Sequence, residues 1–533
     1  MSEESKKLWP TWWVYKNWTS AVHTIGCTLR AAPMSGGYSH AGRPVVRWRW
    51  AVVTSAAIAW PGLRMLCRPF LVSIEHAPVM RAAERSLDSS GGLRGGKGIV
   101  EQFSVLKGRA VLKRRSCSPH TSARRADTAG VSKRYALLCV VVIVAISAGV
   151  RLADLGVFSS YVFDERYYAH DAQALLHGGL AGAGWKSNGM LSQSHPLFGD
   201  EVIAAGIAVL GNHPWGWRIM SALAGVALIA LVYPLARRML LRRSWAVVAT
   251  GLTACDTLLI AQSRVGMLDS FVALWTATCV YCALRAVRAP KSRLWATYCG
   301  VAGGLAMSTK WSGAFAILAA LVILLLWRRR GHVHLVDLAM AVLVLPGAVY
   351  ILTYAPYFAA GHGFSQWLDL QRYMTAHGMS LHQPDANSSA PAQWVIDAGA
   401  IWYRWGLVRS DVRGLVALGN PLLWWGALVS LAALAAVAVR RCSRLLALPV
   451  FIVACLYVPW LAVDRTSYIY YMAPVVPFLA VALARGLSML RPRVATAYAV
   501  ATAAPTALWL PFLVSFPVPY AYYHAVMLLP AWR

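Results

Sequence analysis

The stretch Tyr161-Val-Phe-Asp-Glu-Arg-Tyr-Tyr168 places adjacent carboxylates, Asp164 and Glu165, shortly after the first long apolar segment. A carboxylate beside a membrane surface is costly to desolvate unless charges or hydrogen bonds compensate it. Aromatic residues flank the pair on both sides. The stretch therefore predicts a chemical site at one face of a membrane. The structural alternative is a solvated loop pair or a helix N-cap.

The composition supports a membrane protein. Of the 533 residues, 58% are hydrophobic and 14% are charged, against about 45–50% and about 25% in soluble domains. The mean hydropathy is +0.51. We attribute the formal net charge of +30 to basic cytoplasmic loops and a basic N-terminal region, not to nucleic-acid binding. The 10 cysteines show no CxxC or zinc-like spacing, so we expect no disulfide framework and no metal site.

Residues 1–133 differ from the rest of the chain. They are rich in Arg, Ser, Gly and Trp and show no sustained hydrophobic period. Their apolar patch Ala51–Trp60 is shorter than the ~20 residues that a membrane span requires, and the first residues lack a signal-peptide pattern. We expect a cytoplasmic extension that is disordered or not translated, with a folded accessory domain as the alternative. Residues 134–533 form the predicted membrane domain.

From residue 136 the apolar runs predict about eleven transmembrane helices of about 20 residues each. Basic clusters such as Arg237–Arg243, Arg328–Arg330 and Arg440–Arg441 lie on every second connection, which makes these connections and the N-terminus cytoplasmic. The expected fold is all-α, with two longer loops, 153–214 and 357–419, and the C-terminus on the outer face. The predicted spans are 136–152, 215–236, 245–263, 269–287, 294–309, 312–327, 336–356, 420–438, 445–462, 467–486 and 494–514.

This topology brings a mixed set of ionisable residues to the outer face. A carboxylate or an imidazole can act as general base toward a hydroxyl, and Arg or Lys can stabilise a phosphate leaving group. The set suits transfer of a group from a lipid phosphate to a hydroxyl. Its members are Asp164, Glu165, His195, Arg264, Asp269, Lys310 and Arg465.

Each of these residues also has a purely structural interpretation. Arg264 and Asp269 can pair across their tight turn, and Lys310 can extend along the interface. Arg465 can be an ordinary boundary cation, and His195-Pro196 can be a turn. The tryptophans of the outer loops can form an aromatic belt. The sequence leaves both interpretations open for each residue.

The segment Phe163-Asp-Glu-Arg-Tyr-Tyr-Ala-His-Asp171 resembles the Phe-Asp-Glu-x-Tyr-Tyr-x-x-Asp motif of the bacterial protein O-mannosyltransferases, glycosyltransferase family 39. Later blocks follow in a similar order, and the resemblance extends over residues 150–490. These blocks are Ser194-His-Pro196, Gly216-Trp-Arg218, Gln262-Ser-Arg264 through Leu268-Asp269, Thr309-Lys-Trp-Ser-Gly313, Leu418-Gly-Asn-Pro-Leu422 and Arg465 through Pro474-Val-Val-Pro477.

The resemblance implies a GT-C glycosyltransferase fold and inverting transfer of mannose from polyprenyl-phosphate-mannose to Ser or Thr of secreted proteins. The lipid-linked sugar is then a substrate, and neither a cofactor nor a metal is implied. Asp164 would be the general base, and Glu165 would support it or contact the peptide. Arg264 would bind the lipid phosphate, with Lys310 and Arg465 as further candidates. Other candidates at the outer face are His195, Asp269 and Trp311.

The chain departs from the family pattern at one motif. The family reads His-Pro-Pro-x-Gly-Lys where this chain has His195-Pro-Leu-Phe-Gly-Asp200. An inverted charge at an acceptor or phosphate site would alter substrate choice or weaken activity. The loop 357–419 is too short for the luminal MIR domain of eukaryotic members, which favours a bacterial plasma-membrane enzyme whose acceptors arrive through the secretion translocon.

Other functions stay open on the sequence alone. A GT-C enzyme with a lipid or cell-wall glycan acceptor would share the donor chemistry. A transporter or a non-catalytic membrane partner is the alternative from another class. A transporter typically carries polar residues and broken helices near mid-span, whereas the ionisable residues here gather at span ends on one face.

Overall fold

The computed structural model describes residues 131–177, 194–240, 242–288, 292–326, 334–382, 385 and 387–533. These residues belong to the second of the units into which the chain divides, Ser116–Arg533. The N-terminal extension lies outside the described residues except at its end, so its predicted disorder or absence stays a prediction. The basic connection Arg328–Arg330 also lies outside them.

Long apolar runs form the first group of helices. The predicted spans 136–152, 215–236, 269–287 and 294–309 coincide within a few residues with α6, α9, α12 and α13. The helices of this group are α6 (Lys133–Leu152), α7 (Glu165–Leu176), α8 (Phe198–Leu210), α9 (Pro214–Leu240), α10 (Arg243–Ala254), α11 (Thr257–Gln262), α12 (Asp269–Ala286), α13 (Ser292–Thr309) and α14 (Ala314–Leu326).

The second group contains more broken helices. The predicted span 336–356 divides into α15, a π-helical turn and α16, because Pro346 at the start of α16 cannot donate to the preceding turn. The helices are α15 (Leu335–Ala339), α16 (Leu345–Leu352), α17 (Ala355–Ala359), α18 (Phe364–Ser380), α19 (Pro391–Trp394), α20 (Pro421–Arg440), α21 (Arg444–Tyr457), α22 (Val476–Leu487), α23 (Pro492–Ala501), α24 (Ala503–Leu513) and α25 (Tyr520–Val526).

Among the described residues, 6 helices are long and apolar enough to cross a membrane. Two shorter apolar helices, Trp311–Leu326 and Val476–Leu487, accompany them. The predicted helical membrane fold is confirmed, while the count of about eleven spans stays a prediction. The 6 candidate spans are Lys133–Leu152, Pro214–Met239, Leu335–Leu352, Pro421–Arg440, Arg444–Ala462 and Pro492–Leu513.

Small residues allow the helices to approach closely. Helix α9 packs against α6, α8, α10 and α12, while α13 packs against α12 and α16. At the contact between α13 and α16, a Cβ on Gly304 would lie 2.7 Å from the Cβ of Val349, and one on Gly300 would lie 2.8 Å from the Cβ of Leu345. This spacing of small residues supports tight packing where lipid offers helices no hydrophobic driving force to associate.

The prediction of a purely α-helical fold is wrong in one region, because the loop 357–419 contains two strands. Strands β1 (Ile401–Val408) and β2 (Asp411–Ala417) form an antiparallel hairpin, and the short β3 (Val518–Pro519) pairs with β2. The register runs from Ile401 opposite Ala417 to Val408 opposite Asp411. One face of the sheet packs on α24 and α25, which makes a separate apolar cluster.

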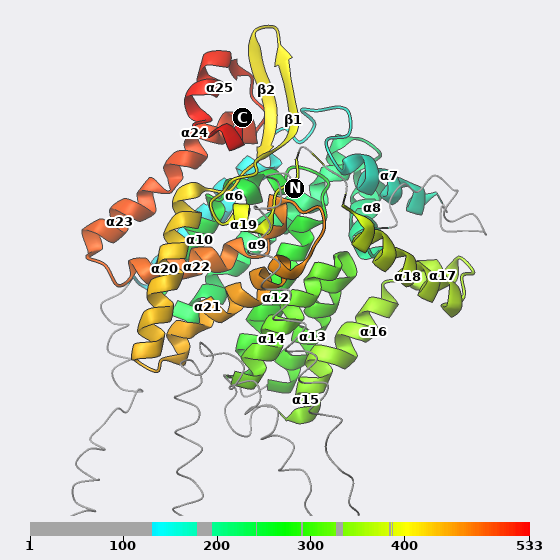
Figure 1. Ribbon diagram of the computed structural model, residues 1–533, viewed down its shortest axis with the longest axis horizontal. Coiled ribbons are helices and arrows are strands. Elements are labelled where there is room, and N and C mark those ends of the chain that lie inside the picture. The colour runs from blue at the N-terminus through cyan, green and yellow to red at the C-terminus, as the bar shows by residue number, and fades with distance from the viewer. Residues whose placement is uncertain are drawn as a thin grey trace, which may run out of the picture. The chain divides into compact units, whose positions relative to one another are not determined.

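Figure 1 shows α7, the β1–β2 hairpin, α18 and α25 toward one end of the helices. Helix α15 and the turn between α20 and α21 lie toward the other end (Figure 1). Helix α7, the β1–β2 hairpin and the C-terminal helix α25 thus lie toward one end, and the turn that contains Arg440–Arg441 lies toward the other, while the membrane face that each end meets stays a prediction.

Candidate active site

The chain enters α7 in a strained conformation. Phe163 has φ 51°, in the left-handed region that a bulky residue rarely adopts. Its ring packs against Tyr403 of β1 at a centroid distance of 4.9 Å and against Tyr470 at 6.2 Å. Strained residues persist only where their surroundings hold them, and they are often found at functional sites. Asp164 follows Phe163 and directly precedes α7.

The Glu165 carboxylate accepts hydrogen bonds from one arginine and two backbone N–H groups. Its carboxylate makes a bidentate ion pair with Arg218, with Nε–Oε1 at 2.7 Å and Nη2–Oε2 at 2.8 Å. The backbone N–H groups of Val162 and Gly266 each donate to it at 2.8 Å. Glu165 is fully buried and Arg218 is almost so. The chain thus satisfies a buried charge with a paired cation and further hydrogen bonds, as such a charge requires.

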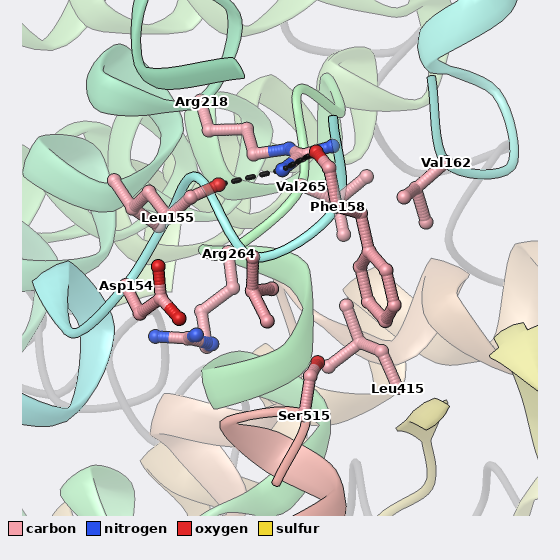
Figure 2. A pocket seen from close by; sticks show the side chains of 10 residues that line it. Asp154, Leu155, Phe158, Val162, Arg218, Arg264, Val265, Leu415 and Ser515 are labelled. Carbon is pink, nitrogen blue, oxygen red and sulfur yellow. Dashed lines mark hydrogen bonds between the residues drawn. The ribbon is translucent and has the colours of Figure 1, made fainter. Parts of the chain in front are cut away.

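Arg218 also orders the loop that precedes Asp164. Its Nη1 donates to the carbonyl oxygens of Leu155 at 2.5 Å and Phe158 at 3.0 Å, and its Nη2 donates to that of Ser160 at 3.2 Å. Figure 2 shows this guanidinium lying against the loop. We call Glu165, Arg218 and the backbone groups that they bind the Glu165 clamp.

Asp164 faces a large cavity. The cavity has a volume of about 710 Å³ and combines cationic, acidic and tyrosine side chains. No hydrogen bond to the Asp164 carboxylate is present within the described part of the chain, in contrast to its neighbour Glu165. The lining residues are Tyr161, Phe163, Asp164, Arg166, Tyr167, Tyr168, Ser194, His195, Tyr373, His377, Leu381, Asp385, Asn387, Arg465, Tyr468, Tyr470 and Tyr471.

The surroundings of Asp164 favour its protonated form. Burial raises the pKa of Asp164 from 3.8 to about 6; the positive charge of Lys310 opposes the rise, and the negative charge of Asp269 adds to it. A general base works best when its pKa lies near the working pH. At neutral pH Asp164 is therefore ionised and can still accept a proton.

Lys310 and Asp269 form a buried pair whose charges both act on Asp164. Lys310 Nζ lies 2.7 Å from Asp269 Oδ2, and both side chains are almost fully buried. The same ammonium lies 5.3 Å from the ring centre of Tyr470 and 5.5 Å from that of Tyr471, which both line the cavity. The sequence left open a pairing of Asp269 with Arg264, but the structure pairs Asp269 with Lys310.

Arg465 and His195 both line the cavity. Arg465 donates from Nη2 to the hydroxyl of Tyr471 at 3.2 Å and from Nη1 to the carbonyl of Gly378 at 3.3 Å. Burial lowers the pKa of His195 well below its ordinary value, and the nearby charges of Lys310 and Arg465 lower it further. His195 is thus neutral at pH 7, and its ring can donate or accept a hydrogen bond in the cavity.

Asp385 supplies a second carboxylate on the rim. It accepts hydrogen bonds from the Tyr468 hydroxyl at 2.7 Å and the Asn387 backbone N–H at 2.8 Å. Burial raises the pKa of Asp385, but the hydrogen bonds from Asn387 and Tyr468 outweigh this and hold it below its ordinary value. Asp385 is therefore an ionised hydrogen-bond acceptor, whereas Asp164 is the carboxylate that can take up a proton near neutral pH.

Other candidates from the sequence lie away from the cavity lining. Arg264 donates from Nη1 to the carbonyl of Val150 at 2.7 Å, and it lines a separate cavity of about 10 Å³, roughly the space of one water molecule. Figure 2 shows its guanidinium beside the Asp154 carboxylate. The Trp311 indole donates to the hydroxyl of Tyr350 at 2.8 Å.

Asp200, the departure from the family motif, is buried in α8 and does not line the cavity. Burial raises its pKa well above the ordinary value, and the charges of Asp171 and Glu201 raise it further. Asp200 therefore lies within the protein and away from the cavity, in surroundings that favour its protonated form, and not at the phosphate or acceptor site that the sequence suggested.

Sequence reasoning missed several residues of the cavity. His377 lies on α18, within the loop 357–419, and nothing in the sequence connects it to Asp164. Tyr468, Tyr470 and Tyr471 follow Arg465 closely, and this run of tyrosines after a candidate cation is a usable signal. Arg218 was noticed only as part of a motif block, because its partner Glu165 is 53 residues away.

No cluster of metal-ligating side chains occurs among the residues that the structure describes. The arrangement instead offers a carboxylate able to take up a proton, with cations beside it. It suits an acceptor hydroxyl that approaches Asp164 and a donor that carries an anionic leaving group.

Comparison with known proteins gives a consistent result. Residues 137–360 match the family described as dolichyl-phosphate-mannose-protein mannosyltransferase. A polyprenol-phosphate-mannose–protein mannosyltransferase of Mycobacterium tuberculosis is 28% identical over 459 residues, which cover 70% of this chain and 86% of that protein. An undecaprenyl phosphate-alpha-4-amino-4-deoxy-L-arabinose arabinosyl transferase of Pseudomonas aeruginosa is 32% identical over 214 residues, or 38% of each chain.

The fold agrees with a solved structure. The S. cerevisiae protein O-mannosyltransferase Pmt1-Pmt2 complex bound to the sugar donor superposes with a TM-score of 0.64 at 12% sequence identity. The match covers 78% of this chain and 94% of that chain. This likeness shows the GT-C fold that the sequence predicted, and residues 137–360 are similar to the dolichyl-phosphate-mannose-protein mannosyltransferase family.

Proposed function

We propose that this protein transfers mannose from polyprenyl-phosphate-mannose to Ser or Thr hydroxyls of secreted proteins, with Asp164 as the general base. The observation that carries the proposal is the position of Asp164 on a cavity of about 710 Å³. Its pKa of about 6 keeps it ionised at neutral pH, yet it remains basic enough to take up a proton.

The proposed reaction is a single displacement. Asp164 removes the proton from the acceptor hydroxyl while the hydroxyl oxygen attacks the anomeric carbon of mannose. The bond between that carbon and the phosphate oxygen breaks on the opposite face, which inverts the anomeric centre. The polyprenyl phosphate leaves with the bonding electron pair, and a cation positioned beside the leaving oxygen stabilises its charge.

We propose Arg465 as the principal ligand of the leaving phosphate. It lines the cavity that Asp164 faces, and a guanidinium suits planar recognition of phosphate oxygens. The positive charge of Lys310 acts on Asp164 and opposes the rise of its pKa. Glu165 acts indirectly, because the Glu165 clamp holds the loop that carries Asp164. Arg264 contributes to the same loop region more than to the phosphate, because it lines a different cavity.

The proposed membrane orientation rests on the basic connections. Arg440–Arg441 and the other basic clusters favour a cytoplasmic side, and α7 lies at the opposite end of the helices from that turn (Figure 1). The cavity and the C-terminus would then face outward across the plasma membrane. Acceptor chains would meet the cavity while still unfolded, as they leave the secretion translocon.

A second function is favoured by one observation. The partial match to the P. aeruginosa arabinosyl transferase covers 38% of this chain. A lipid or cell-wall glycan acceptor would use the same base and the same leaving group. The two functions differ only in which hydroxyl enters the cavity.

The test is transfer of radiolabelled mannose from polyprenyl-phosphate-mannose in membranes that contain the wild type or Asp164→Asn. Both a Ser/Thr-rich peptide and a lipid extract are offered as acceptors. We expect label on the peptide, and a rate about 100- to 10,000-fold lower for Asp164→Asn.

The matched control is Asp369→Asn, which changes an exposed carboxylate on α18. We expect it to transfer mannose at the wild-type rate. Label on the lipid fraction alone would replace the protein acceptor by a lipid one, and a fully active Asp164→Asn would refute the assignment of the base.

A further inference from the structure

Strand β1 has an unpaired edge. The strand order is β1–β2–β3, so β1 pairs with β2 on one side only. Within the described part of the chain, no other backbone group bonds to Ile401–Val408. An edge strand presents a row of free N–H and C=O groups, which is a ready template for another extended chain.

The outer half of β1 is exposed and apolar. Trp405 is 44% exposed, Leu407 is 57% exposed and Val408 is 44% exposed. The ring of Tyr520, at the start of α25, is also exposed. Proteins usually blunt an exposed edge with charges or cover it. Here the exposed side chains beside the free backbone groups are apolar at Trp405, Leu407 and Val408 and charged at Arg404.

The inner end of β1 packs against Phe163, the residue before Asp164. Tyr403 packs on Phe163 at 4.9 Å, and Phe163 lines the cavity. The hydroxyl of Tyr403 accepts a hydrogen bond from the Gln262 side chain at 2.7 Å, which fixes the ring. A bulge between Trp402 and Arg404 releases Tyr403 from the regular pairing. Ile401–Val408 does not itself line the cavity, so the contact between β1 and the cavity wall runs through the ring of Phe163, the residue before Asp164.

The hairpin is anchored to the loop before Asp164. The guanidinium groups of Arg404 and Arg413 lie 5.9 Å and 5.6 Å from the ring centre of Phe158. Arg413 also donates from Nε to the carbonyl of Ser515 at 3.0 Å. Figure 2 shows Leu415 of β2 on the same side as Phe158 and Ser515. A hairpin anchored in this way loses little conformational entropy when a partner binds.

We propose that the free edge of β1 binds the acceptor polypeptide as an added strand and leads its Ser or Thr residue to Asp164. The proposal rests on the proposed transfer to proteins and specifies how the acceptor is held. Backbone pairing tolerates almost any side chain, so it suits an enzyme that modifies many unfolded chains. The exposed part of β1, Arg404–Val408, would pair with about five acceptor residues, or about 17 Å of extended chain.

The test is a backbone-ester scan of one acceptor peptide. Each variant peptide replaces a single N–H by an ester oxygen on one side of the acceptor Ser, which removes a donor and leaves every side chain in place. In a strand, successive N–H groups point to opposite edges. We expect KM to rise about two- to tenfold at every second position, with little change at the positions between.

The second arm is photo-crosslinking with benzoylphenylalanine at Leu407, with Val209 as the control position. Val209 is 80% exposed on α8 and does not belong to the hairpin. We expect the radiolabelled peptide to crosslink at Leu407 and not at Val209. A scan without a two-residue period, or crosslinking of Leu407 to lipid instead of peptide, would overturn the proposal while transfer itself stays intact. Failure of the unmodified peptide to accept mannose would refute the proposed function, and the strand proposal with it.

Discussion

Asp164 and Glu165 are neighbours in sequence, yet they lie in opposite environments. Glu165 receives bonds from Arg218 and from the backbone N–H groups of Val162 and Gly266. Asp164 faces the cavity, and burial raises its pKa to about 6. A satisfied carboxylate stabilises the fold, whereas a carboxylate without donors is free to take up a proton. Of these two adjacent residues, Glu165 therefore stabilises the fold, and Asp164 is available for proton transfer.

The largest effect is expected from breaking the Glu165 clamp. Arg218→Met removes the partner of a buried charge and the donors that order the loop 153–163, so we expect the folded state to lose about 3–5 kcal/mol. Thermal unfolding in detergent, followed by tryptophan fluorescence, measures this loss. The matched control is Arg372→Met, whose exposed pair with Asp369 should contribute less than about 1 kcal/mol. Equal melting temperatures for the two variants would refute the clamp.

The next effect distinguishes the arginines. Arg465 lines the cavity and Arg264 does not. We expect Arg465→Ala to slow transfer about 100-fold, because a leaving phosphate loses its cation. Arg264→Ala should act mainly on stability, because Arg264 holds the Val150 carbonyl. Steady-state kinetics with varied donor concentration checks both variants. A selective donor defect in Arg264→Ala, with none in Arg465→Ala, would restore Arg264 as the phosphate ligand that the sequence predicted.

A smaller effect is expected from pH. The pKa of Asp164 is raised to about 6, so below pH 6 the carboxyl holds a proton and cannot act as base. We expect kcat/KM to rise about tenfold per pH unit below 6 and to level off above it. A pH profile of mannose transfer by the wild type measures the midpoint. An acid limb centred near pH 4, the ordinary value for Asp, would show that the cavity does not perturb this group.

The smallest effect is expected at Asp200. Burial raises the pKa of its carboxyl and so favours the neutral form, which Asn matches closely in shape and charge. We expect Asp200→Asn to transfer mannose within about twofold of the wild type and to melt within a few degrees of it. A large change in substrate choice would instead mean that this departure from the family motif acts in the reaction.

Much of the helical fold could be predicted because apolar runs of a span's length determine helices in a membrane. The span predicted at 269–287 is the helix Asp269–Ala286, for example. The hairpin Ile401–Ala417 could not be predicted in the same way. Its strands are short, and Arg and Gly interrupt their apolar residues. The tryptophans of this loop were also open to interpretation as an aromatic belt.

Part of the set of candidate residues from the sequence lies together in the structure. Asp164, His195 and Arg465 do line one cavity. The sequence could not show which of the adjacent carboxylates faces it, because that depends on Arg218 in a distant helix. It also could not separate Arg264 from Arg465, because both follow the ends of apolar runs and only packing places one of them at the cavity.

The most direct test of the division between Asp164 and Glu165 is a paired measurement on Asp164→Asn and Glu165→Gln, in which transfer rate and melting temperature are recorded for the same samples. Ionising Asp164 at pH 7 costs stability because its pKa is raised, and Asn avoids that cost. Gln at position 165 presents an amide N–H to groups that all donate, so it cannot be satisfied. We predict that Asp164→Asn loses transfer with an unchanged or higher melting temperature, whereas Glu165→Gln melts markedly lower. A melting temperature that falls in Asp164→Asn and holds in Glu165→Gln, with transfer retained in Asp164→Asn, would contradict the account.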